Sequence, residues 1–224
     1  MALIVWRGDT SWQPVSMGAM TSTHPQRRIG LTGGIASGKS SVACLLQRNH
    51  GLPLLDADVM ARQALAAGTA AAHQVAARYG DRVLAAGSDP AAAVLDRSAL
   101  GQIVFGDAAE RQWLEQLVHP IVRQGFAAEL QRLDAAPTVV LVIPLLFEAG
   151  LEPLCSEVWL VDCDEQQQLE RLMARDNLSA DAARARIAAQ WPLARKRALA
   201  SRILDNRSTP DALAAQISRA LGTD

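Results

Sequence analysis

Lysine is almost absent from this chain. Of its 22 lysines and arginines, only Lys39 and Lys196 are lysines. The abundance of arginine and alanine is typical of a codon bias and indicates no function by itself. In such a chain a lysine is not expected to be just one of many exposed surface residues without a specific role. The position of Lys39 in a glycine-rich stretch therefore indicates a function for that stretch.

The chain also lacks a charge excess and long hydrophobic runs. Its formal net charge is −1, whereas a broad nucleic-acid or membrane surface normally shows clustered Lys and Arg. The longest apolar candidate, residues 138–147, is interrupted by Pro144, and a bilayer span needs roughly 18 to 20 residues. We therefore expect a soluble protein with small-molecule partners and with no nucleic-acid or membrane partner.

Cysteine pairs are missing as well. Cys44, Cys155 and Cys163 form no C-x-x-C pair and lie within apolar patterns, where cysteine is usually a small buried hydrophobe. This usage favours a reduced, cytoplasmic location. The apolar patch at the N-terminus is too short and too early for a signal peptide, so residues 1–26 are expected to be a tail, either disordered or the result of a start assigned too far upstream.

The chain does contain an alternation of apolar strands and helices. Strands are predicted at residues 27–32, 52–58, 138–147, 157–163 and 201–206, and helices at 38–51, 164–176 and 209–221. Residues 59–136 are mostly helical in pattern, with breaks at 87–90, 105–107 and 119–120. Strand, helix and strand within some 30 residues form a βαβ unit, which requires a parallel sheet. The pattern predicts an α/β fold with a five-stranded parallel sheet and a helical insertion after the second strand.

One motif stands between the first strand and the first helix. Gly33, Gly38, Lys39 and Ser40 match the phosphate-binding pattern G-x-x-x-x-G-K-[ST]. Glycines allow positive φ, so that backbone N–H groups turn inward around a phosphate, and the helix N-terminus adds partial positive charge. The lysine would bridge the β- and γ-phosphates, and the serine hydroxyl would face Mg²⁺. The alternative, a glycine-rich turn without a ligand, leaves the scarce lysine unexplained.

The rest of the chain narrows the class of nucleotide chemistry. A GTP-binding switch needs a guanine-reading N-K-x-D, and a transporter ATPase needs the LSGGQ signature; the chain has neither. A kinase for a small metabolite remains. Such a kinase needs an acceptor oxygen held in line with the γ-phosphate, a group that orients it and takes its proton, and cations over the transferring group.

Two aspartates are placed for this chemistry. Asp56 and Asp58 end the second predicted strand, and parallel strands deliver ligands at their carboxyl ends. Residues two apart in a strand point to the same face. We predict Asp58 as the base and Asp56 as the support on the metal side, with Ser40 as the other metal-side residue. Alternatively, either aspartate could cap the helix that follows.

Blocks of sequence along the chain carry a family resemblance. In order and spacing the chain closely resembles the dephospho-CoA kinase family from about residue 28 to its end, in the blocks GLTGGIASGKSSVA (30–43), LDADVMARQAL (55–65), LVHPIV (117–122), VIPLLFEAG (142–150), VDCDEQQQLERLMARD (161–176) and RIAAQ (186–190). The resemblance implies transfer of the ATP γ-phosphate to the ribose 3′-hydroxyl of dephospho-coenzyme A, the final step of coenzyme A biosynthesis, with Mg²⁺. It implies a three-layer P-loop kinase fold, in which residues 67–136 form a helical CoA-binding subdomain and residues 175–197 a lid.

The resemblance also assigns residues. The family's base falls on Asp58, its lid arginine on Arg175, and its adenine-side loop on Asp205 and Asn206. With Lys39, Asp58 and Arg175 form the predicted catalytic set. The phosphate loop maps to Gly33, Gly34, Ile35, Ala36, Ser37, Gly38, Lys39, Ser40 and Ser41.

Two positions depart from the family pattern. Ala36 stands where the family usually has glycine, and Ser41 replaces a threonine but keeps the hydroxyl. An alanine costs little if the residue has negative φ, and it alters the local loop geometry otherwise.

Several other residues admit two interpretations. Arg62, one helical turn after Asp58, could reach a diphosphate of the acceptor or pair with that aspartate, and we favour the cleft. His119 could contact the acceptor or bond at a helix end. Arg175 could complement a helix dipole, although its place before a basic lid-like segment favours phosphate contact. Glu148 could order the metal shell or the acceptor side, or cap a turn.

Two arginines of the predicted lid are weighed together. Arg184 and Arg186 are two residues apart on a helix and face different directions, so at most one is expected to reach the nucleotide. The alternatives to the main assignment are another P-loop nucleoside or small-metabolite kinase, and a nucleotide-binding module without chemistry. A monomer or a small homo-oligomer is expected.

Overall fold

The computed structural model describes residues 3–6, 12–15 and 26–223. Within the range expected to be a tail, Leu3–Trp6 (β1) and Trp12–Val15 (β2) pair as antiparallel strands, so the tail is not devoid of regular structure. The remainder of residues 1–25 lies outside the described residues.

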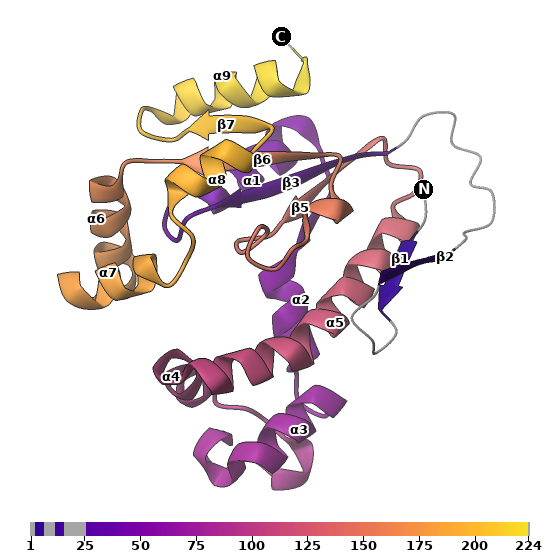
Figure 1. The fold of residues 1–224 in the computed structure, drawn as a ribbon, viewed down its shortest axis with the longest axis vertical. Coiled ribbons are helices and arrows are strands. Elements are labelled where there is room, and N and C mark those ends of the chain that lie inside the picture. Colours follow the sequence, from indigo (N-terminus) through magenta and orange to yellow (C-terminus); the bar gives the residue numbers. More distant parts are fainter. Residues whose placement is uncertain (1–2, 7–11, 16–25, 224) are drawn as a thin grey trace.

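A five-stranded parallel sheet forms the centre of the molecule (Figure 1). Its strands follow the order β4-β5-β3-β6-β7, with bounds Arg27–Gly33 (β3), Leu54–Asp56 (β4), Thr138–Val142 (β5), Glu157–Asp162 (β6) and Arg202–Asp205 (β7). The predicted strand number and direction are therefore confirmed. Because β3 is central and its chain neighbour β4 lies beyond β5, the chain winds first to one side of β3 and later to the other.

One face of the sheet is covered by two helices whose ends follow the sequence signals. Helix α1 (Lys39–His50) ends at Gly51, which adopts φ 64° and donates its N–H to Gln47 O. Helix α9 (Pro210–Leu221) begins after Thr209, whose hydroxyl accepts from Ala212 N. Both helices were predicted within one residue of these limits. Their apolar faces and the strands share a buried core that includes Ile29, Leu31, Leu46, Trp159 and Ile217.

The opposite face is covered mainly by the long helix α5 (Ala108–Arg132). Val118, Val122 and Phe126, in the middle and second half of α5, are buried against the sheet, so three layers form as predicted. The prediction of a break at residues 119–120 was wrong, because α5 continues through Pro120. Burial of the side chains around this proline offsets the hydrogen bond that it removes from the helix.

The helical insertion has a small core of its own. Helix α2 (Ala57–Ala64) leads from β4 to α3 (Ala70–Tyr79), two 3₁₀ turns (Gly80–Val83 and Pro90–Ala92) and α4 (Arg97–Gly106). The insert core contains Val75, Val83, Leu100 and Val104, against which the first half of α5 packs. Helix α5 thus joins two cores, and its second half belongs by packing to the sheet although it lies within the range 67–136.

The remaining helices lie near β6 in the chain. A 3₁₀ turn (Glu152–Leu154) precedes β6, and α6 (Glu165–Asp176), α7 (Ala180–Ala188) and α8 (Leu193–Leu199) follow it. We call residues 165–188 the arm, because α6 and α7 pack together and project beside the sheet (Figure 1). None of the helices in the described part of the chain is both long enough and apolar enough to cross a membrane.

Two strands end two or more residues earlier than predicted. The strand expected at 138–147 ends at Val142, and turns follow, in keeping with Pro144, which has no N–H for a sheet ladder. The strand expected at 52–58 ends at Asp56, where α2 already begins.

Candidate active site

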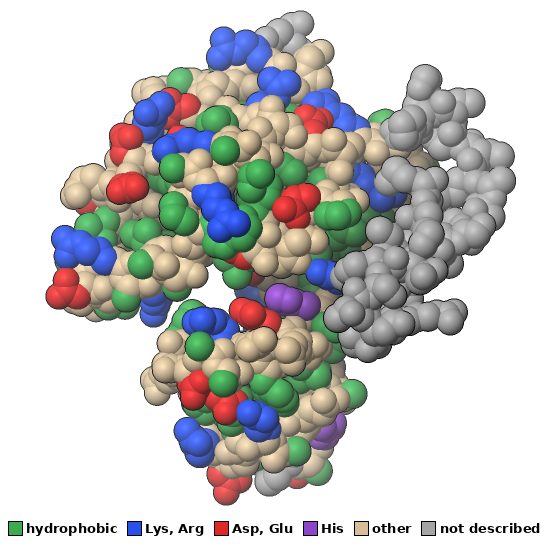
Figure 2. All heavy atoms as spheres, viewed as in Figure 1, with side chains coloured by type: hydrophobic (Ala, Val, Ile, Leu, Met, Phe, Trp, Pro, Cys, Tyr) green, Lys and Arg blue, Asp and Glu red, His purple; other side chains and the backbone are tan. Residues whose placement is uncertain are grey.

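The carboxyl ends of the strands meet at one edge of the sheet. Gly33 ends β3, Asp56 ends β4, Asp162 ends β6 and Asp205 ends β7. Ligands of open parallel sheets bind outside this edge, near the point where the strand order reverses. Figure 2 shows a hollow between the arm and the α4 end of the insert. This edge is therefore the candidate active site.

The phosphate loop occupies the centre of the edge, between β3 and α1. Lys39 Nζ donates to Gly33 O at 3.1 Å and to Gly34 O at 2.8 Å, which keeps the ammonium over the loop. Gly38, the residue before α1, has φ 98°. The N-terminus of α1 offers unpaired N–H groups and partial positive charge beside this ammonium, which is an arrangement that binds anions.

The loop is packed too closely for larger residues at its glycines. A Cβ added at Gly33 would lie 2.6 Å from Ser37 Oγ and from Val161 O. At Gly38 a Cβ would collide with Asn206 Nδ2, which donates to Ser37 O at 2.8 Å. The motif glycines are thus required by the positive φ at Gly38 and by close neighbours at both positions.

Ala36 carries strain. Its φ is 57°, so the condition under which alanine would cost little, a negative φ, is not met. The left-handed conformation costs a residue with a Cβ about 1–2 kcal/mol, and it persists only where the surrounding structure enforces it. The departure from glycine at this position is therefore a real cost in the loop.

Lys39 is perturbed electrostatically. Desolvation in the loop, followed by the like charge of Lys196, lowers the pKa of Lys39 to about 8; Asp58 opposes this shift and Arg175 adds to it. The ammonium thus lacks enough negative charge around it. A bound polyphosphate would supply that charge and restore the pKa.

Asp56 and Asp58 adopt different roles in the backbone. Asp56 Oδ1 accepts from Asp58 N at 2.8 Å and from Val59 N at 3.2 Å, so Asp56 is the N-cap of α2. Asp58 lies in the first turn of α2, which means that the two residues do not share a strand face as predicted. Partial desolvation and the neighbouring Asp56 raise the pKa of Asp58, against the lowering effect of Lys39 and Arg62. A raised pKa makes the Asp58 carboxylate a better proton acceptor near neutral pH.

The residues present fit a magnesium ion of the kind used with nucleotides. Ser40 is exposed in the first turn of α1, and the capping bonds of Asp56 use Oδ1 alone. No group of three or more His, Cys, Asp or Glu side chains in the described part of the chain could hold a metal ion. Mg²⁺ in such sites takes only one or two protein ligands and completes its shell with phosphates and water, so a hydroxyl and a carboxylate oxygen match the kind of donors that it needs.

Three predicted substrate or transfer residues have different local surroundings. Arg62 Nε donates to Asp58 O at 3.1 Å, so the arginine lies back along α2. Arg175 is exposed in the arm and binds Asp176 through two hydrogen bonds of 2.7 and 3.1 Å. His119 lies inside α5, so its helix-end interpretation was wrong. Burial lowers the pKa of His119.

The predicted adenine-side residues are also engaged. Asp205 binds Arg207 with two hydrogen bonds of 2.7 Å, while Asn206 holds the phosphate loop through Ser37 O. Glu148 binds the turn between α7 and α8 through its side chain. Its Oε1 accepts from Trp191 N at 3.0 Å and lies 2.7 Å from Lys196 Nζ.

Three residues near the loop were missed in the sequence. Lys196 is 0% exposed, and the scarcity of lysine that singled out Lys39 applied equally to it. Gln168 Nε2 donates to Ile35 O at 2.7 Å, and Ile35 N donates to Gln190 Oε1 at 2.8 Å. Gln190 ends the RIAAQ block, which carried the resemblance but received no role.

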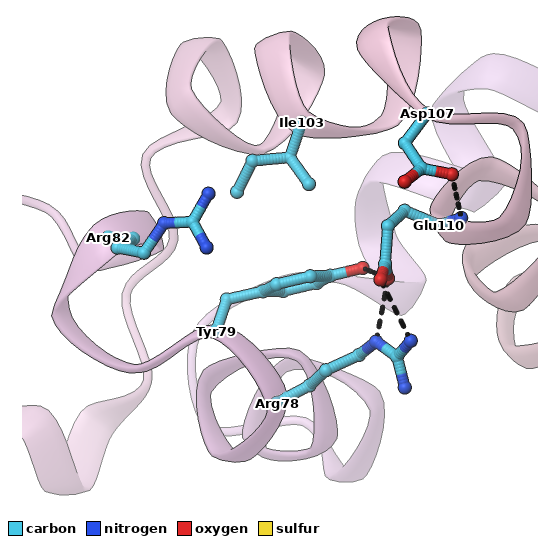
Figure 3. Close-up of a pocket in the computed structure, with 6 residues that line it drawn as sticks. All are labelled: Arg78, Tyr79, Arg82, Ile103, Asp107 and Glu110. Carbon is cyan, nitrogen blue, oxygen red and sulfur yellow. Dashed lines mark hydrogen bonds and ion pairs between the residues drawn. The ribbon is translucent and has the colours of Figure 1, made fainter.

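A pocket on the insert (Figure 3) is lined by residues of the insert and the start of α5, and by none of the strand-end residues. Arg78, Tyr79 and Glu110 line it, and Arg78 and Tyr79 both bind the Glu110 carboxylate. These bonds join α3 to α5, and we interpret this group as a link that holds the insert together.

Known proteins resemble the chain over most of its length. A dephospho-CoA kinase from Synechococcus sp. (strain CC9605) is 62% identical over 187 residues, which cover 84% of this chain and 88% of the relative. A dephospho-CoA kinase from Prochlorococcus marinus (strain MIT 9313) is 57% identical over 195 residues, covering 87% of this chain and 95% of the relative.

Solved structures agree. A crystal structure from Thermus thermophilus matches with a TM-score of 0.73 and 38% identity, covering 88% of this chain and 97% of that one. Dephospho-CoA kinase from Campylobacter jejuni matches with a TM-score of 0.65 and 26% identity, covering 88% and 96%. The family model for dephospho-CoA kinase matches residues 27–211, a range that holds the phosphate loop, Asp58 and the whole sheet. The chain belongs to the dephospho-CoA kinase family.

Proposed function

We propose that this enzyme transfers the γ-phosphoryl group of ATP to the ribose 3′-hydroxyl of dephospho-coenzyme A and so forms coenzyme A. The observation that carries the proposal is the meeting of a complete phosphate loop and Asp58 at one edge of the sheet, in a member of this family.

On the donor side, the loop and Lys39 bind the phosphates. The backbone N–H groups and the N-terminus of α1 face the anion, and Lys39 neutralises charge on the β- and γ-phosphates. Mg²⁺, held by Ser40 and supported by Asp56, supplies further neutralising charge when bound. Asp205 and Asn206 border the adenine side. Lys39 Nζ, which donates to two loop carbonyls in the ligand-free loop, donates to the phosphates once they are bound.

On the acceptor side, Asp58 orients the 3′-hydroxyl and accepts its proton. A loosely bonded transition state makes orientation as important as proton removal. Arg62 and His119 bind the acceptor, and the insert at residues 67–136 encloses it. Arg175 reaches the transferring phosphoryl group when the α6 and α7 part of the predicted lid (residues 175–197) closes, and it then exchanges its bonds to Asp176 for phosphate.

The chemistry requires only small molecules. We infer a cytoplasmic enzyme that acts as a monomer or a small homo-oligomer. The free thiols of Cys44, Cys155 and Cys163 support a reducing compartment, and light scattering coupled to size-exclusion chromatography measures the oligomeric state.

Purified protein incubated with Mg²⁺, ATP and dephospho-CoA tests the proposal by mass spectrometry. We expect coenzyme A to form, and neither the Lys39→Met variant nor an acceptor lacking the 3′-hydroxyl should give it. ATP binding without coenzyme A, in both the native chain and the Ala36→Gly variant, would contradict the proposed acceptor. If coenzyme A formed only in the Ala36→Gly variant, the inactivity of the native chain would come from the alanine in the phosphate loop.

A further inference from the structure

Two buried or half-buried glutamines meet the phosphate loop at a single residue. Gln168, in the first turn of α6, is 2% exposed and donates to Ile35 O at 2.7 Å. Gln190, in the turn between α7 and α8, accepts from Ile35 N at 2.8 Å. Ile35 precedes the strained Ala36, so both hydrogen-bonding groups of the neighbouring backbone are fixed by side chains.

The contact surface around this residue is tight. A Cβ at Gly34 would collide with Gln168 Nε2 and would lie 3.5 Å from a Leu193 methyl. Gln168 and Leu193 are both buried, so the loop cannot move away from either side chain without a wider change. Gln168 of α6 and Leu193 of α8 thus pack tightly against the phosphate loop.

The same two glutamines mark the ends of the arm. The chain leaves Gln168 along α6, turns into α7, and returns at Gln190. Any shift of the arm relative to the sheet therefore acts on the Ile35 backbone from one or both ends. Ala36, with φ 57°, is the residue in the loop where that fixation matters, because a left-handed alanine relaxes unless its neighbours hold it.

We propose that Gln168 and Gln190 are positioning residues that hold Ile35 and thereby keep Ala36 in the left-handed conformation that the phosphate loop needs to bind ATP. The proposal rests on the assignment of ATP as the donor, but it does not depend on the identity of the acceptor. Neither glutamine touches the reacting atoms; each acts through the loop backbone.

The two bonds have opposite polarity, which provides a matched test. Gln190 contributes an acceptor, which Gln190→Glu keeps and Gln190→Met removes at similar length. Gln168 contributes a donor, which Gln168→Met removes at similar length. We expect Gln190→Met and Gln168→Met to weaken ATP binding about five- to tenfold, the range of one lost hydrogen bond, and Gln190→Glu, which keeps the acceptor, to lose less ATP affinity than Gln190→Met. Calorimetry without acceptor measures these affinities, and the acceptor KM should not change.

Restoring glycine tests the link to Ala36. In the Gln190→Met background, Ala36→Gly should recover most of the lost ATP affinity, because glycine adopts positive φ without enforcement. In the native background the same change should have a smaller effect. This non-additivity is the signature of coupling.

Several results would overturn the proposal. These are equal losses for Gln190→Glu and Gln190→Met, a lower melting temperature with unchanged ATP affinity, and an Ala36→Gly effect of the same size in both backgrounds. Coenzyme A need not form in any of these experiments, so failure of the proposed acceptor would leave this test intact.

Discussion

On the phosphate-loop side of the candidate active site the functional groups are held by buried partners, whereas on the acceptor side they are exposed. Lys39 lies on two loop carbonyls, and Lys196 of α8 is fully buried against Glu148. Asp58 and Arg175 face solvent. From this difference we expect that the proposed ATP site is built before substrates bind, and that the proposed transfer site is completed by the acceptor and by movement of the arm.

The same difference divides the range predicted as the lid. In its α7 half, the Arg184–Asp181 pair has side chains 63% and 97% exposed. In its α8 half, Lys196 forms an ion pair with Glu148, which lies outside the lid range; the two side chains are 0% and 15% exposed. Arg197 of α8 binds the buried Asp162. Exposed pairs contribute little to stability, whereas breaking a buried pair leaves an uncompensated charge. Motion is therefore expected in α7 and the adjoining part of α6, with α8 fixed.

The strongest test separates chemistry from stability at Asp58. Asp58→Asn should lower kcat by about 10² to 10⁴, the contribution of a general base, while ATP affinity remains nearly native. The free energy of unfolding should change by less than about 0.5 kcal/mol, because the side chain is exposed. Steady-state kinetics, calorimetry and denaturation measure the three quantities. Residual turnover above a tenth of the native rate would remove Asp58 from its role.

On the buried side, Lys196→Met should cause a large loss of stability. It leaves the Glu148 charge without its partner, which costs about 3–5 kcal/mol. The double variant Lys196→Met with Glu148→Gln should recover most of the loss, because the neutral amide still accepts from Trp191 N. Urea denaturation measures each free energy of unfolding. A loss below about 1 kcal/mol for the single variant would show that α8 is not fixed by this pair.

The buried setting of Lys39 predicts a pH dependence of ATP binding. Its pKa is lowered to about 8 in the ligand-free protein, and the phosphates bind the charged form. Affinity should be level at pH below about 7 and should fall as pH rises through 8, by up to about tenfold per pH unit. Calorimetry in buffers of different ionisation enthalpy should reveal proton uptake above pH 8.

Two variants give the controls for this dependence. In Lys39→Met the dependence above pH 8 should vanish. In the double variant at Lys196 and Glu148 the midpoint should move to higher pH, since the like charge of Lys196 is one cause of the lowered pKa. A native midpoint above pH 9.5 would contradict the electrostatic account of the loop.

The sequence predicted those parts that depend on local signals. Glycine at the end of α1, Thr209 before α9 and the spacing around Lys39 specify local conformation, so these elements lie where expected. The predictions that failed concern positions where two structural preferences compete. At Asp56 the capping interaction ended the strand before Asp58, and at Pro120 tertiary packing overrode the proline signal.

The partners of Gln168, Gln190 and Lys196 could not be predicted, because they join segments far apart in sequence. Ile35 and Gln190 are separated by 155 positions, and no pattern within either segment indicates the other. Glu148 has the same property, since its partners Trp191 and Lys196 come from the segment predicted as a lid. Finding the partners of these residues thus required the fold.

The smallest expected effect tests the exposed half of the lid. Arg184→Ala removes an exposed pair three residues apart on α7, so the free energy of unfolding should change by less than about 0.5 kcal/mol and kcat should stay within about twofold. Arg175→Ala is the matched comparison, with a similarly exposed side chain. It should lower kcat at least tenfold with equally little effect on stability, because its charge is used only when the phosphoryl group is transferred. A loss of kcat in Arg184→Ala as large as that in Arg175→Ala would mean that the arm closes with α7 over the nucleotide. The division between a fixed α8 and a moving arm would then have to include a direct phosphate contact from α7.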